Sequence, residues 1–307
     1  MSTVEKAAEK LKSLQPEQAE SPIIEAVALH PAPMHPAPTV ERLQERTRKQ
    51  DHATEVAPLW HLDFSAVERA GLLPADDEAN RRLTDELRRV KRPLLDNATG
   101  KGPKALAHME RIIVSSAEPG EGKTFTALNL ALSLAREPDF EVVLVDGDVP
   151  KGDLTRVLGL EGQPGLMDVL ADERRKPAEV IVRTDVPNLL VVPAGQRHVL
   201  AAELFGSLRM EYVLEEFVGR NRRRLLVFDS SPLLATSESQ ALVALMGQAV
   251  VVVAAGRTRR HALSSALQNL KDSQYVGLIL NMSRLPASEN HYDRSYGRYS
   301  GDNEGDA

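Results

Sequence analysis

The chain has 307 residues, of which 42% are hydrophobic and 27% charged, with a net charge of −6 and no cysteine. This composition is typical of a globular protein. The missing cysteines exclude disulfides, thiolate metal sites and cysteine nucleophiles, and the acidic balance gives no general attraction for nucleic acid. No apolar run approaches the roughly 20 residues that span a bilayer, and the first residues lack a signal peptide's apolar core, so we expect a cytoplasmic protein.

The first 56 residues predict a flexible segment. Residues 2–14 place several apolar side chains on one helical face, which predicts a short helix that is marginal alone. It is either a frayed end or a segment that docks on a partner or a membrane surface. The stretch "HPAPMHPAP" (30–38) holds four prolines and predicts an extended linker. A ligand for a proline-binding groove is the alternative.

A charged helix is predicted next, because apolar residues repeat at helical spacing between 83 and 90. Pro93 is predicted to end this helix near Arg92. A row of charged residues lies on the other face at steps of three: Glu86, Arg89 and Arg92. This row is either a solvated helix face or a contact with a neighbouring subunit.

Apolar runs then alternate with helical stretches from residue 111 to residue 281. The predicted strands are "RIIVSSA" (111–117), "EVVLVDGD" (141–148), "NLLVVPAG" (188–195), "RLLVFDSS" (224–231), "AVVVVAAG" (249–256) and "YVGLILN" (275–281). Continuous Val, Leu and Ile runs suit strands that are buried on both faces. The alternation predicts an α/β fold with a mostly parallel β-sheet flanked by helices on both faces.

The stretch "RIIVSSAEPGEGKTFTALNLALSLA" has the strand, glycine-containing loop and helix of a P-loop, although Ala117 takes the place of the usual first glycine. Backbone N–H groups of such a loop converge on phosphate oxygens, and the helix N-terminus adds partial positive charge. Lys123 is expected to reach the outer phosphates, and the Thr124 hydroxyl is expected to ligate Mg²⁺. The predicted nucleotide-binding residues are Gly120, Glu121, Gly122, Lys123, Thr124 and Phe125.

Acidic residues end two of the predicted strands. Asp146 and Asp148 end one, and Asp229 ends another. In a parallel sheet these ends share one edge with the P-loop. Carboxylates there can hold Mg²⁺ or its waters, and one of them can accept a proton from an attacking hydroxyl.

Together "SSAEPGEGKTFTALNLALSLA", "VVLVDGD" and "LLVFDSSPLL" resemble the bacterial tyrosine kinases, which are cytoplasmic P-loop kinases of exopolysaccharide systems. The segment "AGLLPADDEANRRLTDELRRVKRPLL" resembles the part that precedes the P-loop in exosortase-associated tyrosine autokinases. The resemblance covers about residues 60–285. It implies a kinase domain over residues 57–285, with ATP and Mg²⁺ as cofactors.

The resemblance also implies roles for individual residues. Asp146 becomes the candidate base or metal-organising residue, Asp148 and Asp229 position Mg²⁺ with Thr124, and Asn281 contacts adenine. The charged row of Glu86, Arg89 and Arg92 matches an E-x-x-R-x-x-R pattern that joins subunits of this family into a ring. A homo-oligomer and a membrane-anchored polysaccharide chain-length regulator are the implied partners. Such a regulator would recruit the protein to the inner face of the membrane.

The chain departs from the family pattern at two sites near the acidic residues. Lys151 and Gly152 lie where an arginine and a proline are frequent after the second aspartate, and lysine lacks the bidentate fork of arginine. Ser231 replaces one of two frequent prolines after the last aspartate.

The C-terminal stretch "NHYDRSYGRYSGDNEGDA" holds three of the five tyrosines. Residues 286–307 contain few apolar residues, so we expect a flexible tail rather than part of a core. Beside a P-loop, these tyrosines are best explained as phosphoacceptors for a neighbouring active site: Tyr292, Tyr296 and Tyr299.

Two alternatives to an autokinase remain open. One is a non-kinase ATPase switch of the partitioning or division-site type. Those switches carry a signature lysine early in the P-loop, where this chain has Glu118. The other is a scaffold that ATP binding only organises, while partner proteins perform the chemistry.

Overall fold

The structure is a computed structural model that describes residues 59–102, 106–219, 224–270 and 274–283. The predicted N-terminal helix, the proline-rich linker and the tyrosine-bearing tail lie outside these residues. No helix in the described ranges is long and apolar enough to cross a membrane.

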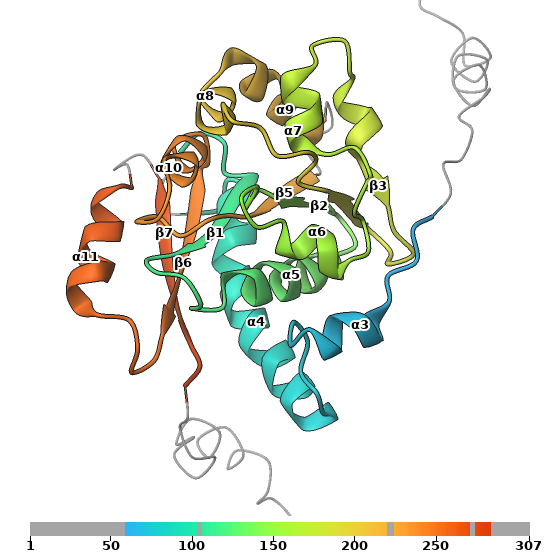
Figure 1. The fold of residues 1–307 in the computed structure, drawn as a ribbon. Helices are drawn as coiled ribbons and strands as arrows, with labels where there is room; N and C mark the ends of the chain where they lie inside the picture. The colour runs from blue at the N-terminus through green and yellow to red at the C-terminus, as the bar shows by residue number, and fades with distance from the viewer. Residues whose placement is uncertain (1–58, 103–105, 220–223, 271–273, 284–307) are drawn as a thin grey trace, which may run out of the picture. The chain divides into compact units, whose positions relative to one another are not determined.

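Seven strands in the described part of the chain form one sheet, in the order β3-β4-β2-β5-β1-β6-β7 (Figure 1). All neighbouring strands are parallel except β3 and β4, which are antiparallel. The bounds are β1 (Arg111–Ser116), β2 (Glu141–Asp146), β3 (Val182–Arg183), β4 (Leu189–Val192), β5 (Arg224–Asp229), β6 (Gln248–Ala254) and β7 (Tyr275–Asn281).

Helices pack on both faces of this sheet. One face is covered by α3 (Phe64–Arg69), α4 (Asp77–Ala98), α5 (Lys123–Leu134) and α6 (Asp153–Val157). The other face is covered by α7 (Leu166–Ala171), the 3-10 helix η1 (Pro177–Val180), α8 (Ala201–Phe205), α9 (Leu208–Val218), α10 (Ser237–Val243) and α11 (Arg260–Gln268). The α/β class with a mostly parallel sheet is confirmed.

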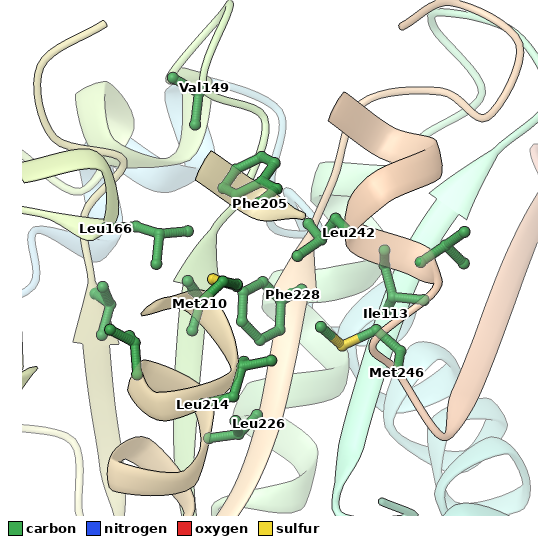
Figure 2. Close-up of a cluster of buried hydrophobic side chains, with 14 of the residues drawn as sticks. Ile113, Val149, Leu166, Phe205, Met210, Leu214, Leu226, Phe228, Leu242 and Met246 are labelled. Atoms are coloured by element: carbon green, nitrogen blue, oxygen red, sulfur yellow. The ribbon is translucent and has the colours of Figure 1, made fainter. Parts of the chain in front are cut away.

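The two faces of the sheet have separate hydrophobic cores, because successive residues of a strand point to opposite sides. On β1, Ile113 faces the core under α7–α11, whereas Ile112 and Val114 face the core under α3–α6. Figure 2 shows the first of these cores, where Phe228 of β5 lies near Met210 and Leu214 of α9. Burial on both sides explains the continuous apolar runs of the central strands.

All six predicted strands are present, and each observed strand is within three residues of its predicted bounds at either end. Strand β3 was not predicted, because two residues give no periodic signal. The edge strand β7 also differs from the central strands: its residues alternate between half-buried and exposed, with Leu278 and Leu280 exposed. The sequence of β7 is thus a continuous apolar run like that of a buried strand, although one of its faces is half-buried and the other is exposed.

The predicted end of the charged helix at Arg92 is wrong, because α4 continues through Pro93 to Ala98. An internal proline removes one helical hydrogen bond and costs about 3 kcal/mol. Contacts after the proline offset this cost. Leu94 is buried in the core, and Asn97 Nδ2 donates to Gln248 Oε1 of β6 at 2.9 Å. Tertiary packing therefore overrides the local signal.

Candidate nucleotide and phosphoryl-transfer site

The strand order brings the predicted site residues to one edge of the sheet. Strand β5 lies between β1, which leads into the P-loop, and β2. In the register of β2 and β5, Asp146 lies directly opposite Asp229. Two acidic residues 83 positions apart in the sequence are therefore neighbours beside the P-loop, as the sequence predicted.

The P-loop is held by three side-chain contacts. Asn281 Nδ2 donates to the Glu121 carbonyl at 3.0 Å. The buried Glu121 carboxylate accepts from the Glu118 N–H at 2.9 Å and from the Thr258 hydroxyl. Gly122 has φ 94°, and a Cβ there would lie 2.0 Å from Asn281 Nδ2. This close approach requires glycine, and it fixes the loop at the N-terminus of α5.

Lys123 forms a buried ion pair with an acidic side chain of the site. Its Nζ lies 2.6 Å from Asp148 Oδ2, and the Ser231 hydroxyl donates to Asp148 Oδ1 at 2.7 Å. Burial acts to lower the pKa of Lys123, but the charges of Asp229 and Asp148 outweigh it, and the net shift is upward. The lysine therefore stays protonated and can meet phosphate oxygens as a cation.

Asp146 is fully buried and makes hydrogen bonds with both of its oxygens. Oδ2 accepts from the Thr155 N–H at 2.8 Å and from the Thr155 hydroxyl at 2.7 Å, and Oδ1 accepts from the Asp148 N–H at 3.3 Å. Burial raises its pKa to about 6, against the opposing effect of the Thr155 hydrogen bonds. In this arrangement Asp146 holds the turn that carries Asp148.

Asp229 differs from the other two aspartates, because neither of its buried oxygens has a hydrogen-bond partner of good geometry among the described residues. Burial raises its pKa to about 7, while Lys123 and the nearby Thr124 hydroxyl act to lower it. An unsatisfied carboxylate is costly in a protein interior unless a cation completes it. The oxygens of Asp229, Thr124 and Asp148 therefore fit Mg²⁺, which prefers hard oxygen ligands.

The described residues hold no cluster of three or more acidic or histidine side chains that would cage a metal by themselves. This absence is compatible with Mg²⁺, because that ion keeps several waters and takes phosphate oxygens as further ligands. Two or three protein oxygens beside the P-loop are therefore sufficient to hold Mg²⁺ together with water and phosphate oxygens.

A cleft of about 420 Å³ opens over the P-loop. All of the predicted nucleotide-binding residues except Glu121 line it: Gly120, Gly122, Lys123, Thr124, Phe125 and Asn281. Leu72, Lys151 and Met282 also line it, and the sequence did not predict them as nucleotide-binding residues. Met282 has φ 58°, a conformation that is rare for a residue with a side chain and is frequent at functional sites.

Leu72 is positioned by the P-loop helix. The Asn129 side chain on α5 donates to the Leu72 carbonyl at 2.8 Å and to the Phe125 carbonyl at 2.8 Å. No sequence pattern indicated this link, because Leu72 and Asn129 are 57 positions apart.

The predicted interface residues lie together on α4, away from the cleft. Glu86 and Arg89 are exposed and form no ion pair within the described residues, whereas Arg92 Nε lies 3.4 Å from Asp96 Oδ2. The predicted phosphoacceptors Tyr292, Tyr296 and Tyr299 lie outside the described residues.

The family described as "AAA domain" matches residues 109–276, which include the P-loop and the three aspartates. The chain belongs to this family. The matched region thus covers strands β1 to β6 and the first two residues of β7.

Relatives of this AAA domain include bacterial tyrosine kinases. The tyrosine-protein kinase YwqD of Bacillus subtilis is 29% identical over 179 residues, which are 58% of this chain and 74% of YwqD. EpsB of Ralstonia nicotianae is 30% identical over 61% of this chain, but the chain spans only 25% of EpsB. The succinoglycan biosynthesis transport protein ExoP of Rhizobium meliloti is 30% identical over 75% of this chain and 30% of ExoP.

A solved structure supports the same relationship. The kinase domain of the Escherichia coli tyrosine kinase ETK is similar with a TM-score of 0.57 and 26% identity, over 81% of this chain and 90% of that domain. The fold is therefore that of a P-loop NTPase with a seven-stranded, mostly parallel sheet.

Proposed function

We propose that the protein is an ATP-dependent protein-tyrosine autokinase that phosphorylates the tyrosines of its own C-terminal segment, in trans within an oligomer. The observation that carries this proposal is the arrangement of Lys123, Asp148 and Asp229 around one P-loop. The similarity to tyrosine-protein kinases supports tyrosine as the acceptor.

The P-loop would hold the phosphates of ATP through the backbone N–H groups around Gly120 and Gly122 and through the N-terminus of α5. Lys123 would leave Asp148 for the outer phosphate oxygens, which are stronger charge-assisted acceptors. Mg²⁺, held by Thr124, Asp148 and Asp229, would supply neutralisation of the charge that develops on the phosphates.

The transferred group is the γ-phosphoryl of ATP. The phenol oxygen of a tail tyrosine forms the new bond to phosphorus, the bond between phosphorus and the β,γ-bridging oxygen breaks, and ADP leaves. The phenol proton must be accepted because a phenol has a pKa of about 10. Asp146 is the candidate acceptor, but both its oxygens are engaged. Its contacts support the role of organising the metal-binding turn more directly than the role of base.

The biological setting belongs to the same proposal. We place the protein in exopolysaccharide synthesis or export, because ExoP is a succinoglycan biosynthesis transport protein. The pattern of residues 70–95 favours the exosortase-associated subgroup. A ring-forming oligomer, a membrane-anchored chain-length regulator as activator and a position at the inner face of the membrane complete the proposal.

A non-kinase ATPase switch is the second candidate. In that class a lysine early in the P-loop is expected, whereas this chain has Glu118, whose backbone N–H is fixed to Glu121. A glutamate cannot contact the phosphates bound by a partner subunit as a cation, and this favours the kinase over the switch.

The test is a mixing experiment with two full-length variants. Lys123→Met keeps the tail but loses the phosphate-binding cation, and the triple variant Tyr292→Phe, Tyr296→Phe, Tyr299→Phe keeps the site but loses the acceptors. We expect neither variant alone to gain phosphotyrosine with Mg·ATP, and the Lys123→Met chain to gain it in the mixture. ATP hydrolysis by the wild type without any phosphotyrosine would favour the switch instead.

A further inference from the structure

A second cleft, of about 490 Å³, lies beside the nucleotide cleft. Its walls are the turn after β2 (149–152), Thr155 of α6, the segment 161–164 with Asp168 of α7, Arg175, and the segment 194–197 that follows β4. The two clefts meet at the turn after β2, because Lys151 lines both of them. None of the residues predicted as catalytic, nucleotide-binding or metal-binding lines this second cleft.

Cations without partners line the second cleft. Lys151, Arg175 and Arg197 form no ion pair with any carboxylate in the described ranges. The Nε atom of Arg175 is buried and has no hydrogen-bond acceptor among the residues that the structure describes. A buried donor without an acceptor is costly, and an anionic ligand would satisfy it.

The acidic residues of the cleft do not neutralise these cations. Asp168 accepts the Gly165 N–H at 2.7 Å and the Gln196 N–H at 3.4 Å, so it fixes the shape of the wall. Glu161 is the other acidic side chain of the lining and is exposed to solvent. Three cations against these two carboxylates leave the cleft with a positive surplus, and it is termed the basic cleft below.

We propose that the basic cleft binds the acidic, tyrosine-bearing segment 286–307 of this protein as the acceptor of the phosphoryl transfer. This inference rests on the proposed kinase function and names how its acceptor is recognised. The segment carries five acidic side chains and two arginines, and its tyrosines are interspersed with these charges. Its surplus of carboxylates is complementary to the unpaired cations of the cleft.

The wall of the basic cleft also connects it with the phosphoryl-transfer site. The Thr155 hydroxyl lines the cleft, donates to Asp146 at 2.7 Å and accepts from the Ala194 N–H at 2.9 Å. Lys151 stands between the basic cleft and the P-loop. A segment bound by Arg175 and Arg197 would therefore lie beside the turn 149–152, which carries Lys151 and borders the nucleotide cleft.

The experiment measures binding of a labelled peptide with the sequence of residues 286–304 to the full-length protein by fluorescence anisotropy. The variants are Arg197→Glu and Arg175→Met. Arg174→Glu is the matched control, since Arg174 is exposed and neighbours Arg175 but does not line the cleft. Lys151 is left unchanged because it also lines the nucleotide cleft. A second peptide, with its four acidic residues replaced by lysine, tests charge complementarity.

We expect Arg197→Glu to weaken binding of the native peptide at least tenfold, and Arg175→Met to weaken it severalfold. Arg174→Glu should change it less than twofold. The peptide with lysines in place of its acidic residues should bind Arg197→Glu more tightly than the wild type. ATP affinity should be the same in all variants, which also shows that they are folded. Equal peptide affinity in wild type and Arg197→Glu, or equal weakening by Arg174→Glu, would overturn the inference.

Two results separate this inference from the proposed function. If the peptide binds through Arg197 but the wild type transfers no phosphoryl group, the kinase proposal fails and the binding site stands. If the wild type phosphorylates the peptide with the same KM as Arg197→Glu, the kinase proposal stands and the binding site is refuted.

Discussion

The ammonium group of Lys123 lies 2.6 Å from the carboxylate of Asp148, and both side chains are buried. The proposed phosphate-binding cation thus pairs with one of the carboxylates that are proposed to hold Mg²⁺. Binding of Mg·ATP would exchange this pair for a lysine–phosphate contact and a carboxylate–metal contact. In this proposal the same two side chains would stabilise the protein without nucleotide and take part in phosphoryl transfer with it.

Removal of Lys123 should destabilise the nucleotide-free protein as well as abolish phosphoryl transfer. Lys123→Met leaves Asp148 buried without its counterion, and breaking such a pair costs roughly 3 to 5 kcal/mol. Urea denaturation at neutral pH measures this loss. The double variant Lys123→Met, Asp148→Asn should recover most of it, because no uncompensated charge remains. A double variant no more stable than the single one would contradict the pairing.

Asp229 should make the nucleotide-free protein less stable as the pH rises. Its pKa is about 7 in the folded chain and 3.8 in the unfolded chain, so the unfolded state loses its proton first. Between these values the folded state binds more protons, and stability falls with rising pH. Asp229→Asn removes the contribution of Asp229 to this slope, while Asp146, whose pKa is about 6, keeps its own smaller contribution. In EDTA, the melting temperature of Asp229→Asn should therefore match the wild type near pH 4 and exceed it near pH 8.

Mg·ATP should reverse the order of thermal stability of the wild type and Asp229→Asn at pH 8. The wild type should gain thermal stability from Mg·ATP at pH 8, and Asp229→Asn should gain much less because a metal ligand is missing. Asp139→Asn, at an exposed aspartate outside the cleft, serves as the control and should follow the wild type at every pH. An Asp229→Asn protein that is less stable than the wild type at pH 8 in EDTA would refute the account.

Asn129 should affect nucleotide binding although it does not line the cleft. Asn129→Ala removes two hydrogen bonds, each worth about 1 kcal/mol, and releases the Leu72 carbonyl. We expect Mg·ATP affinity, measured by calorimetry, to fall about fivefold. Asn269→Ala is the control, since its side chain donates to the Leu233 carbonyl away from the cleft. Equal losses in both variants would indicate a general loss of stability instead.

The charged face of α4 should govern assembly rather than catalysis at the site itself. Glu86 and Arg89 have no ion-pair partner in the described chain, so a partner subunit can supply one. Glu86→Ala should lower the mass measured by light scattering. Arg88→Ala is the control, because Arg88 already pairs with Asp85 at 2.7 Å within the helix. An assembly unchanged by Glu86→Ala would contradict the interface.

The sequence predicted the sheet and the residues around the P-loop because these features are local. Buried strands require apolar runs, and a phosphate loop requires glycines followed by Lys123 and Thr124. The meeting of Asp146 and Asp229 followed from parallel strand ends sharing one edge. These inferences needed no knowledge of which side chains pack together.

Features that depend on tertiary contacts were missed. Pro93 was expected to end α4, but Leu94 and Asn97 continue it through contacts with the core and with β6. The link between Asn129 and Leu72 has no sequence pattern, because it joins a helix to a distant loop. The sequence showed Ser231 only as a departure from a family pattern. In the structure its hydroxyl donates a hydrogen bond to Asp148.

The most direct test of the proposed kinase is phosphotyrosine mapping by mass spectrometry after the purified full-length wild type is incubated with Mg·ATP. We predict phosphate on one or more of Tyr292, Tyr296 and Tyr299, and none on these residues in Lys123→Met treated in the same way. A wild-type protein that hydrolyses ATP while all three tyrosines stay unmodified would contradict the account.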